Sequence, residues 1–414
     1  MIKEDFKFLN RLSDISNNTG IKFLHRAAAP GSHCPMHMAL ATIRSIKGVS
    51  SLVVGMAECG YYSRFVACSP YGEHKELHYV YELDSNEVVF GCRKGVKKTL
   101  LEMDREGAKV ILVIMTCIPA LIGEDMESIL EEVNPLMNGK AVFIDSAHFK
   151  RNGYQSGFSD TLDQLVRTMG RERTEKRKRV NFFGGARGGE FKLLKDMIIQ
   201  NGYEVSEYAR GFSMDDLYRS RESALSIILD RKMLKAGKTL KEIQGIPYVC
   251  MADRYTGDDI AGGYEEIFCL LSITNYSEIL KGRKLLEKLI QESKEKFLNI
   301  SYIATYPELD ILPVAMFLSS LGMVPELLHV EEFNEDSLPY KEGINALGRD
   351  PYIAYISNKE EILEAFEEPV TLSLGNCQGL ERDNIISDSE LARMSSLWGF
   401  ERSQALLDLI LKNR

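Results

Sequence analysis

Short apolar runs alternate with amphipathic segments along most of the chain. The apolar runs are brief and uninterrupted, which is typical of strands that are covered on both faces. In the first part of the chain they occupy 51–58, 109–116 and 141–145. Residues 94–107 are expected to be helical, and Pro119 lies at a favourable helix start that residues 125–133 continue. This strand–helix–strand alternation predicts a parallel sheet covered by helices.

The alternation begins again after a charged connector at 171–179, which we interpret as a solvated linker. A strand at 180–183, a glycine-rich turn at 184–189 and a helix at 190–200 follow it. A third restart consists of a helix at 309–321 and of strands at 300–305, 326–330, 351–356 and 370–375.

The predicted fold class is therefore α/β, with three Rossmann-like units, each a mostly parallel sheet covered by helices. We expect domains at 1–175, 176–297 and 298–414, the first carrying the candidate cysteines and the third a C-terminal helix. The first 24 residues are predicted to form an amphipathic helix and then a polar break at 17–20, and the tail at 389–412 is predicted to close with an amphipathic helix.

Composition narrows the functional classes. A length of 414 residues allows two to four domains, and 44% hydrophobic residues suffice for sizeable cores. The net charge of −9 argues against a nucleic-acid binder. No apolar run is long enough to cross a bilayer, and the N-terminus lacks the apolar core of a signal peptide. We expect a soluble, cytoplasmic protein without nucleic-acid or membrane partners.

The cysteines are dispersed, and no Cys-x-x-Cys pair occurs. This spacing excludes a zinc ribbon or a ferredoxin-type signature, and a cytoplasmic setting disfavours structural disulfides. A buried cysteine is commonly just a small hydrophobic residue, so each thiol alone carries little information. The eight cysteines are at positions 34, 59, 68, 92, 117, 250, 269 and 377.

Several common catalytic signatures are missing. The segment Gly55–Gly60 has Walker-like glycine spacing, but Tyr61 and Tyr62 stand where the phosphate-binding Lys and the Ser or Thr would be. The turn at 184–189 could cradle a phosphate, but its glycines do not fit the dinucleotide fingerprint, so a tight turn is favoured. No nucleophile elbow or zinc-protease motif occurs.

The segment 31–38 places Cys34 between two histidines, and Cys59 and Cys117 each close a predicted strand. Sheet edges of this kind are the usual place for chemistry in α/β proteins. His33 and His37 could donate hydrogen bonds to cluster sulfurs, ligate a metal or cap the segment, and capping is the default interpretation.

These residues and several further motifs resemble the component-1 superfamily of nitrogenases and nitrogenase-like reductases. That superfamily includes the dark protochlorophyllide reductase catalytic subunits and the nickel-tetrapyrrole reductive cyclase. The similar stretches are Cys34-Pro35 before a helix, the strand, glycine loop and cysteine of 53–65, Glu87-Val-Val-Phe-Gly91, Thr116-Cys117 through Asp125, Gly245-Ile-Pro247 and Ser373 through Gly379. The resemblance spans nearly the whole chain.

The resemblance implies a ligand set. The spacing from Cys34 to Cys59, and from Cys59 to Cys117, is most similar to that of the β-type subunits of the family. By resemblance, these three cysteines bind an iron–sulfur cluster, 4Fe–4S or larger, at an interface with a second component-1-type subunit in a homodimer or heterodimer. Cys68 and Cys92 are possible additional ligands. The electron donor implied is a separate ATP-dependent iron protein.

Departures from the family pattern limit the cofactors and functions that we expect of this chain. The loop before Cys59 contains no proline, residues 224–244 contain no cysteine, and no histidine follows His329. We therefore expect no iron–molybdenum-type cofactor on this chain. The leading hypothesis is a subunit of a nitrogenase-like oxidoreductase that relays electrons to a reducible substrate in the cleft between the units. The alternatives are a scaffold for assembling a metal cluster or tetrapyrrole, and a cluster-free interaction protein.

Overall fold

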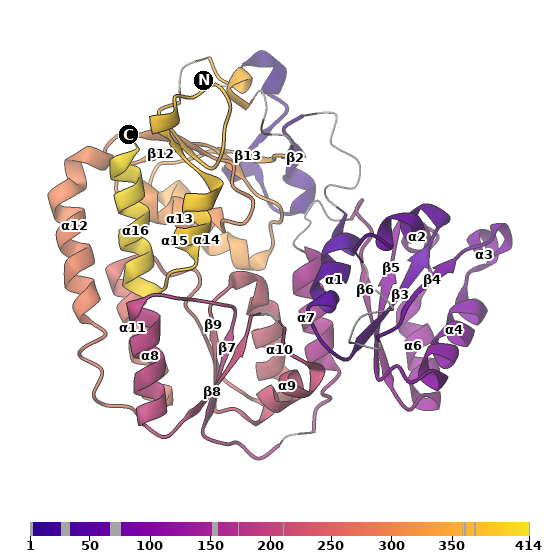
Figure 1. The fold of residues 1–414 in the computed structure, drawn as a ribbon. Coiled ribbons are helices and arrows are strands. Elements are labelled where there is room, and N and C mark those ends of the chain that lie inside the picture. The colour runs from indigo at the N-terminus through magenta and orange to yellow at the C-terminus, as the bar shows by residue number, and fades with distance from the viewer. Residues whose placement is uncertain are drawn as a thin grey trace. The chain divides into compact units, whose positions relative to one another are not determined.

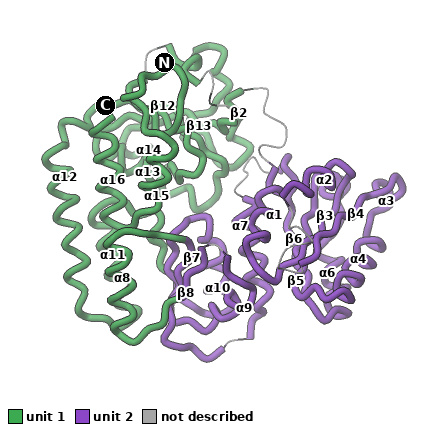
Figure 2. Tube along the Cα trace, viewed as in Figure 1, with its two compact units in different colours: residues 1–32, 185–205, 249–414 green, residues 33–184, 206–248 purple. Residues whose placement is uncertain are grey.

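A computed structural model describes residues 3–25, 34–66, 76–150, 156–172, 174–209, 211–357, 359, 362–367 and 370–413. The chain divides into two compact units (Figure 2). Unit 1 comprises 1–32, 185–205 and 249–414, and unit 2 comprises 33–184 and 206–248. Three sheets are present among the described residues, and their strands are predominantly parallel and flanked by helices. The predicted α/β class is therefore confirmed.

The first sheet lies in unit 2 and has the strand order β4-β3-β5-β6. All of its pairings are parallel. The central strands are buried along their whole length, because an unbroken apolar sequence is stable only where both faces are covered. The strand bounds are β3 Val49–Gly55, β4 His78–Glu82, β5 Val110–Met115 and β6 Lys140–Asp145.

Helices cover this sheet, with α1 and α7 on one side and α4 and α6 on the other (Figure 1). One predicted helix, from Pro119 to residue 133, is instead two. Gly123 has a φ of 78°, which ends α5, and the Asp125 side chain accepts the Ser128 N–H to start α6. The helix bounds are α1 Pro35–Arg44, α2 Ala57–Ser63, α3 Ser85–Phe90, α4 Arg93–Arg105, α5 Cys117–Leu121, α6 Met126–Val133 and α7 Ser156–Arg167.

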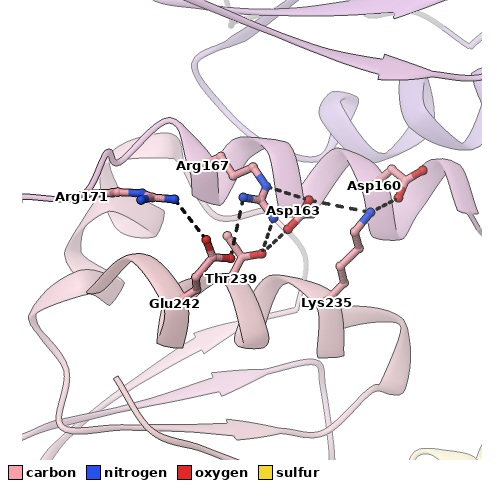
Figure 3. Close-up of polar contacts among 7 residues, drawn as sticks. All are labelled: Asp160, Asp163, Arg167, Arg171, Lys235, Thr239 and Glu242. Atoms are coloured by element: carbon pink, nitrogen blue, oxygen red, sulfur yellow. Dashed lines mark hydrogen bonds and ion pairs between the residues drawn. The ribbon is translucent and has the colours of Figure 1, made fainter. Parts of the chain in front are cut away.

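A polar seam joins α7 to α10 (Leu234–Gln244) within unit 2 (Figure 3). Its centre is the buried carboxylate of Asp163, which accepts hydrogen bonds from Thr239 Oγ1 and, at 3.1 Å, from Arg167 Nε. Lys235 Nζ lies 2.6 Å from Asp160 Oδ1 and 3.8 Å from Asp163 Oδ2. Because a buried carboxylate is costly without partners, this seam fixes how α7 lies against α10.

The second sheet has the strand order β10-β9-β7-β8, and β7 pairs with β9 in parallel. The predicted strand at 180–183 is confirmed as β7. In the charged connector at 171–179, the described residues before Arg179 form no helix or strand. Helix α9 (Met214–Arg219) begins with a Ser213–Asp216 capping box. The strand bounds are β7 Arg179–Phe183, β8 Glu204–Tyr208, β9 Leu225–Ile228 and β10 Tyr248–Cys250.

The third sheet lies in unit 1 and contains seven strands, including two from the N-terminus of the chain. Strand β1 (Asn10–Arg11) pairs antiparallel with β13, and β2 (Lys22–Phe23) pairs with it in parallel. The remaining bounds are β11 Ser301–Ala304, β12 Val324–His329, β13 Tyr352–Tyr355, β14 Leu372–Leu374 and β15 Ile385–Ile386.

The amphipathic helix predicted for the N-terminal stretch 1–24 is wrong. The described part of this stretch forms only short 3-10 turns and the two strands on β13. Leu9 and Leu24 are buried in the core of the third sheet, so pairing with a strand from the C-terminal part of the chain prevails over local periodicity. These strands fall in the range expected for the first domain, and the predicted domain boundaries remain predictions.

Among the other helices of unit 1, α13 packs against β12 of this sheet, and α16 packs against α8, α11, α12 and α15. The amphipathic helix predicted to close the tail is confirmed as α16, and a shorter helix, α15, precedes it. Among the helices in the described part of the chain, none combines the length and the apolar character that a membrane span requires. Their bounds are α8 Gly189–Gln200, α11 Gly257–Leu270, α12 Lys281–Phe297, α13 Ile311–Ser320, α14 Leu338–Ala346, α15 Asp388–Ser395 and α16 Gly399–Lys412.

Candidate functional site

Cys34, Cys59 and Cys117 meet at the carboxyl edge of the first sheet. Cys117 is the first residue of α5, directly after β5. Cys59 does not close β3 as the sequence suggested, because β3 ends at Gly55 and Cys59 lies in the following helix, α2. Cys34 immediately precedes α1, which leads back into β3, so the start of α1 lies at the same edge. The fold therefore brings together three residues that are distant in sequence.

The electrostatics of the thiols show that they are neighbours. Burial, with smaller contributions from the thiols of Cys117 and Cys59, raises the pKa of Cys34 to about 11. The backbone N–H groups of Met36 and His37, at the start of α1, oppose this shift because they stabilise a thiolate. Burial likewise raises the pKa of Cys117, with contributions from Cys59 and Asp145. All three cysteines are half-buried.

Close packing at the end of β3 explains why its last residue, Gly55, is a glycine. A Cβ added to Gly55 would lie 2.2 Å from Thr116 Oγ1 and 3.2 Å from Cys59 Sγ. The buried Thr116 hydroxyl donates to the Val54 carbonyl at 2.9 Å, which ties the end of β5 to the end of β3. The two cysteine-bearing turns are thus fixed against each other, although the loop before Cys59 has no proline.

A second glycine sets the position of Cys34. Gly157, near the start of α7, approaches α1 so closely that an added Cβ would lie 2.1 Å from the Pro35 carbonyl oxygen and 3.0 Å from the Ala39 nitrogen. Because α7 is held on α10 by the Asp163 seam, the start of α1 rests on a fixed surface. Sequence reasoning missed Gly157, since a glycine's close contacts leave no local signal.

A histidine that sequence reasoning also missed touches one of the three cysteines. His148 follows β6, the neighbour of β5, and its Nδ1 atom lies 2.8 Å from Cys117 Sγ. Its imidazole is exposed. The backbone N–H of His148 also faces this sulfur and opposes the rise in its pKa. The available signal was positional, because His148, like Cys117, comes soon after a strand of the same parallel sheet, and such strands end at one edge.

The donor set is chemically suited to an iron–sulfur cluster. Within the described residues, no group of three or more His, Cys, Asp or Glu side chains is arranged to hold a single metal ion. A multi-iron cluster has no such requirement, because its thiolates bind different iron atoms. Three neighbouring, half-buried thiols, two of which face backbone N–H groups, provide the soft ligands and shielding that such a cluster needs.

The other candidate residues have different surroundings. Cys92 is fully buried in the core of the first sheet, and burial raises its pKa to about 12, with a further contribution from Glu124. A thiol beside a carboxylate is a poor site for an additional thiolate, so this environment favours a structural role. His37 contributes its backbone N–H beside Cys34, and its ring lies 6.4 Å from that of Tyr62. Cys68 and His33 lie outside the described residues.

Comparison with known proteins decides the family. The family model for nitrogenase component 1 type oxidoreductases matches residues 34–411, which is most of the chain. The chain belongs to this family. A solved structure, "Nitrogenase Cp1 at pH 6.5", shares the fold with a TM-score of 0.62 at 15% sequence identity, over 94% of this chain and 93% of that one.

Curated relatives in the family match part of the chain. The nitrogenase iron-molybdenum cofactor biosynthesis protein NifE of Clostridium pasteurianum is 26% identical over 41% of this chain and 38% of its own length. The nitrogenase molybdenum-iron protein alpha chain of Methanothermobacter marburgensis is 28% identical over 41% of this chain and 37% of its own length. The matches thus span less than two fifths of either relative. The likeness of the cysteine spacing to β-type subunits remains a prediction.

The glycine-rich turn at 184–189 leaves no space for a phosphate at the start of α8. The Glu401 carboxylate accepts the Glu190 N–H at 3.0 Å, at the start of α8. It occupies the space beside Gly188 and Gly189, where an added Cβ would lie 2.2 and 3.0 Å from its oxygens. An internal anion therefore fills the position that a phosphate would take, in agreement with the tight-turn interpretation.

Exposed apolar side chains gather on the helices that carry or flank the cysteines. They include Tyr61, Tyr62 and Phe65 at α2, Val89 and Phe90 at the end of α3, and Leu121 and Ile122 at the end of α5. Phe90 is 85% exposed and Val89 71%, which is unusual for such residues. The Glu124 carboxylate accepts the Cys92 N–H at 2.6 Å, which joins the segment after α5 to the segment after α3. We call these seven apolar residues the apolar rim.

Proposed function

We propose that this chain is a subunit of a nitrogenase-like oxidoreductase and that Cys34, Cys59 and Cys117 bind an iron–sulfur cluster, 4Fe–4S or larger. The observation that carries the proposal is the meeting of these three thiols at one sheet edge, in a chain of the nitrogenase component 1 type family. When bound, such a cluster accepts and donates electrons one at a time.

The residues of the chain would hold the cluster in three ways. The thiolates supply the ligands, and the N–H groups at the start of α1 stabilise their negative charge. Thr116 and Gly55 fix the spacing between the turns that carry Cys117 and Cys59. Because burial raises the pKa of Cys34 and Cys117, these two thiols would have to release their protons in order to bind iron as thiolates.

The apolar rim supports a second component-1-type subunit as the partner. Its side chains are exposed at α2 and α5, which carry Cys59 and Cys117, and at the end of α3, so a partner that covered the rim would bury apolar surface and also shield the cluster from water. Three thiols also leave room for a ligand from that partner. We propose that electrons come from a separate ATP-dependent iron protein, because the chain's Walker-like segment carries Tyr61 and Tyr62 instead of phosphate-binding residues.

The relatives favour a second candidate function. Four matches named as iron-molybdenum cofactor biosynthesis protein NifE support the proposal that this chain is a scaffold on which a metal cluster or tetrapyrrole is assembled. Matches to nitrogenase alpha chains support the oxidoreductase. A scaffold would use the same three cysteines but would have no turnover of its own.

Two measurements test these proposals in order. Iron counting and EPR spectroscopy on anaerobically purified protein should find a cluster in either case, and an iron-free, colourless protein would contradict both. Steady ATP-dependent electron consumption with the cognate iron protein would then support the oxidoreductase. A cluster that is transferred to an acceptor protein, with no steady consumption of electrons, would support the scaffold instead.

A further inference from the structure

His148 is placed against Cys117 by a loop that has its own anchors. Ser146 binds the end of β5, because its N–H and its hydroxyl both donate to the Met115 carbonyl at 2.9 Å. The Ala147 N–H donates to Asp145 Oδ1 at 3.1 Å, and Lys150 Nζ lies 2.6 Å from Asp145 Oδ2. The loop is thus attached to the strand that delivers Cys117, and the position of His148 does not depend on its contact with the sulfur.

We propose that His148 is a positioning residue whose Nδ1–H donates a hydrogen bond to the Cys117 sulfur when that sulfur binds the cluster. The inference rests on the proposed cluster and deepens it. A metal-bound thiolate only accepts hydrogen bonds, so the hydrogen of this 2.8 Å contact must lie on the nitrogen. Hydrogen bonds to cluster sulfurs favour the more negative, reduced state, because they withdraw charge from the sulfur. His148 therefore raises the reduction potential of the cluster.

Two other roles for the pair fit the geometry less well. Two ligands on one tetrahedral metal, at roughly 2.3 Å for sulfur and 2.0 Å for nitrogen, stand about 3.5 Å apart. The observed separation of 2.8 Å is shorter, so His148 and Cys117 do not bind one iron atom in this arrangement. A Cys–His nucleophile needs a lowered thiol pKa, whereas burial, Cys59 and Asp145 raise the pKa of Cys117.

The test compares three variants of the full chain, purified anaerobically with any partner that accompanies it. His148→Leu removes the donor, and His148→Asn retains an amide N–H near the position of Nδ1. Phe149→Leu changes the next side chain of the same loop, which is half exposed, and controls for disturbance of the loop. Iron content, the midpoint potential from an EPR-monitored redox titration and nitrogen hyperfine coupling are measured for each.

We expect all variants to retain iron, with a lower midpoint potential in His148→Leu than in the wild type, His148→Asn or Phe149→Leu. Iron loss in His148→Leu alone would also support the hydrogen bond, since the amide donor would then suffice. An unchanged potential in His148→Leu would overturn this inference and leave the proposed cluster intact. Iron loss in both histidine variants, or strong nitrogen coupling in the wild type, would overturn it by making His148 a ligand. Iron-free wild-type protein would overturn the proposed function itself, and this inference with it.

Discussion

The helix starts of the first sheet and the start of α8 face very different groups. At α8, the N–H of Glu190 is met by the Glu401 carboxylate, and at α16 the N–H groups of Phe400 and Glu401 are met in return by the Glu190 carboxylate. At α1 and α5, the groups at the helix start are the thiols of Cys34 and Cys117. Helices α8 and α16 thus have carboxylates of the chain at their starts. Helices α1 and α5 have thiols there, which would become anions on binding a metal.

This difference indicates that the contacts between α8 and α16 are structural, whereas the edge that carries the three cysteines is suited to binding. We call the reciprocal contacts of Glu190 and Glu401 the carboxylate exchange. Each carboxylate accepts N–H groups at the start of the other's helix, so no external anion is needed there, and Gly188, Gly189 and Gly399 make room for the two side chains. The sheet edge that carries the three cysteines, which we call the thiol edge, has donors, close packing and an exposed apolar rim, and burial raises the pKa of its Cys34 and Cys117 thiols. Glycines make room for close contacts at both places. At the start of α8 they admit a carboxylate of the same chain, whereas at the end of β3 Gly55 leaves space for the Thr116 hydroxyl and the Cys59 sulfur.

The largest expected effect comes from displacing a cysteine through its support. Gly157→Ala would place a Cβ 2.1 Å from the Pro35 carbonyl oxygen, so the start of α1 must shift and take Cys34 with it. We expect bound iron to fall by at least half and the free energy of unfolding to fall by about 3 kcal/mol. Iron counting and urea denaturation check this.

Gly262→Ala is the matched control for Gly157→Ala. It is also a helical glycine, but the nearest atom to its added Cβ is 3.9 Å away. We expect unchanged iron and a stability equal to or up to about 1 kcal/mol above that of the wild type. Equal iron content in the two variants would contradict the role of Gly157 in positioning Cys34.

The carboxylate exchange predicts a pH dependence in unit 1. The pKa of Glu190 is raised from 4.5 to about 7, chiefly by burial and also by the neighbouring Glu401 carboxylate, while the Tyr264 hydroxyl and the N–H groups of α16 oppose the shift. Between these two pKa values the folded state holds a proton that the unfolded state has lost, so stability falls as pH rises through about 7. Glu190→Gln cannot titrate and should lack this component.

Urea denaturation at pH 5 and pH 8 measures the effect. The wild type should lose up to about 3 kcal/mol more than Glu190→Gln across this range, because each pKa unit corresponds to about 1.4 kcal/mol. Iron content should be the same in both proteins, since this pair of helices is not part of the thiol edge. Parallel pH profiles would show that the exchange does not shift the pKa of Glu190.

A smaller effect is expected at the seam that supports α7. Asp163→Ala leaves Thr239 and Arg167 without their acceptor, and we expect a loss of about 2 kcal/mol, measured by urea denaturation. Arg171→Ala removes a pair with Glu242 from a side chain that is 82% exposed, and should cost less than about 0.5 kcal/mol. Equal losses would show that burial of Asp163 does not strengthen the seam.

Much of the fold was predictable because its information is local. The covered strands β3 and β5 are unbroken apolar runs, and the three runs of the alternation correspond to three sheets. The resemblance to the family singles out Cys34, Cys59 and Cys117 as candidate ligands, and their proximity follows from strands that end at one edge.

The missed features are contacts between distant segments. The Glu190–Glu401 exchange joins two helices that are far apart in sequence, and β1, near the N-terminus, pairs with β13 in the C-terminal part of the chain. Gly157 is required only because α1 passes close to it, and no periodicity in either helix reveals that approach. His148 had a positional signal, but a single exposed histidine after a strand is too common to be singled out without its contact with Cys117.

The most direct test compares two cysteines of the same sheet. Cys59 lies at the thiol edge, whereas Cys92 is buried in the core beside Glu124. Iron content and EPR spectra are measured for anaerobically purified Cys59→Ala and Cys92→Ala. We expect Cys59→Ala to lose the cluster signal and most of its iron, and Cys92→Ala to keep both. A Cys59→Ala variant with full iron and an unchanged spectrum would contradict the ligand assignment.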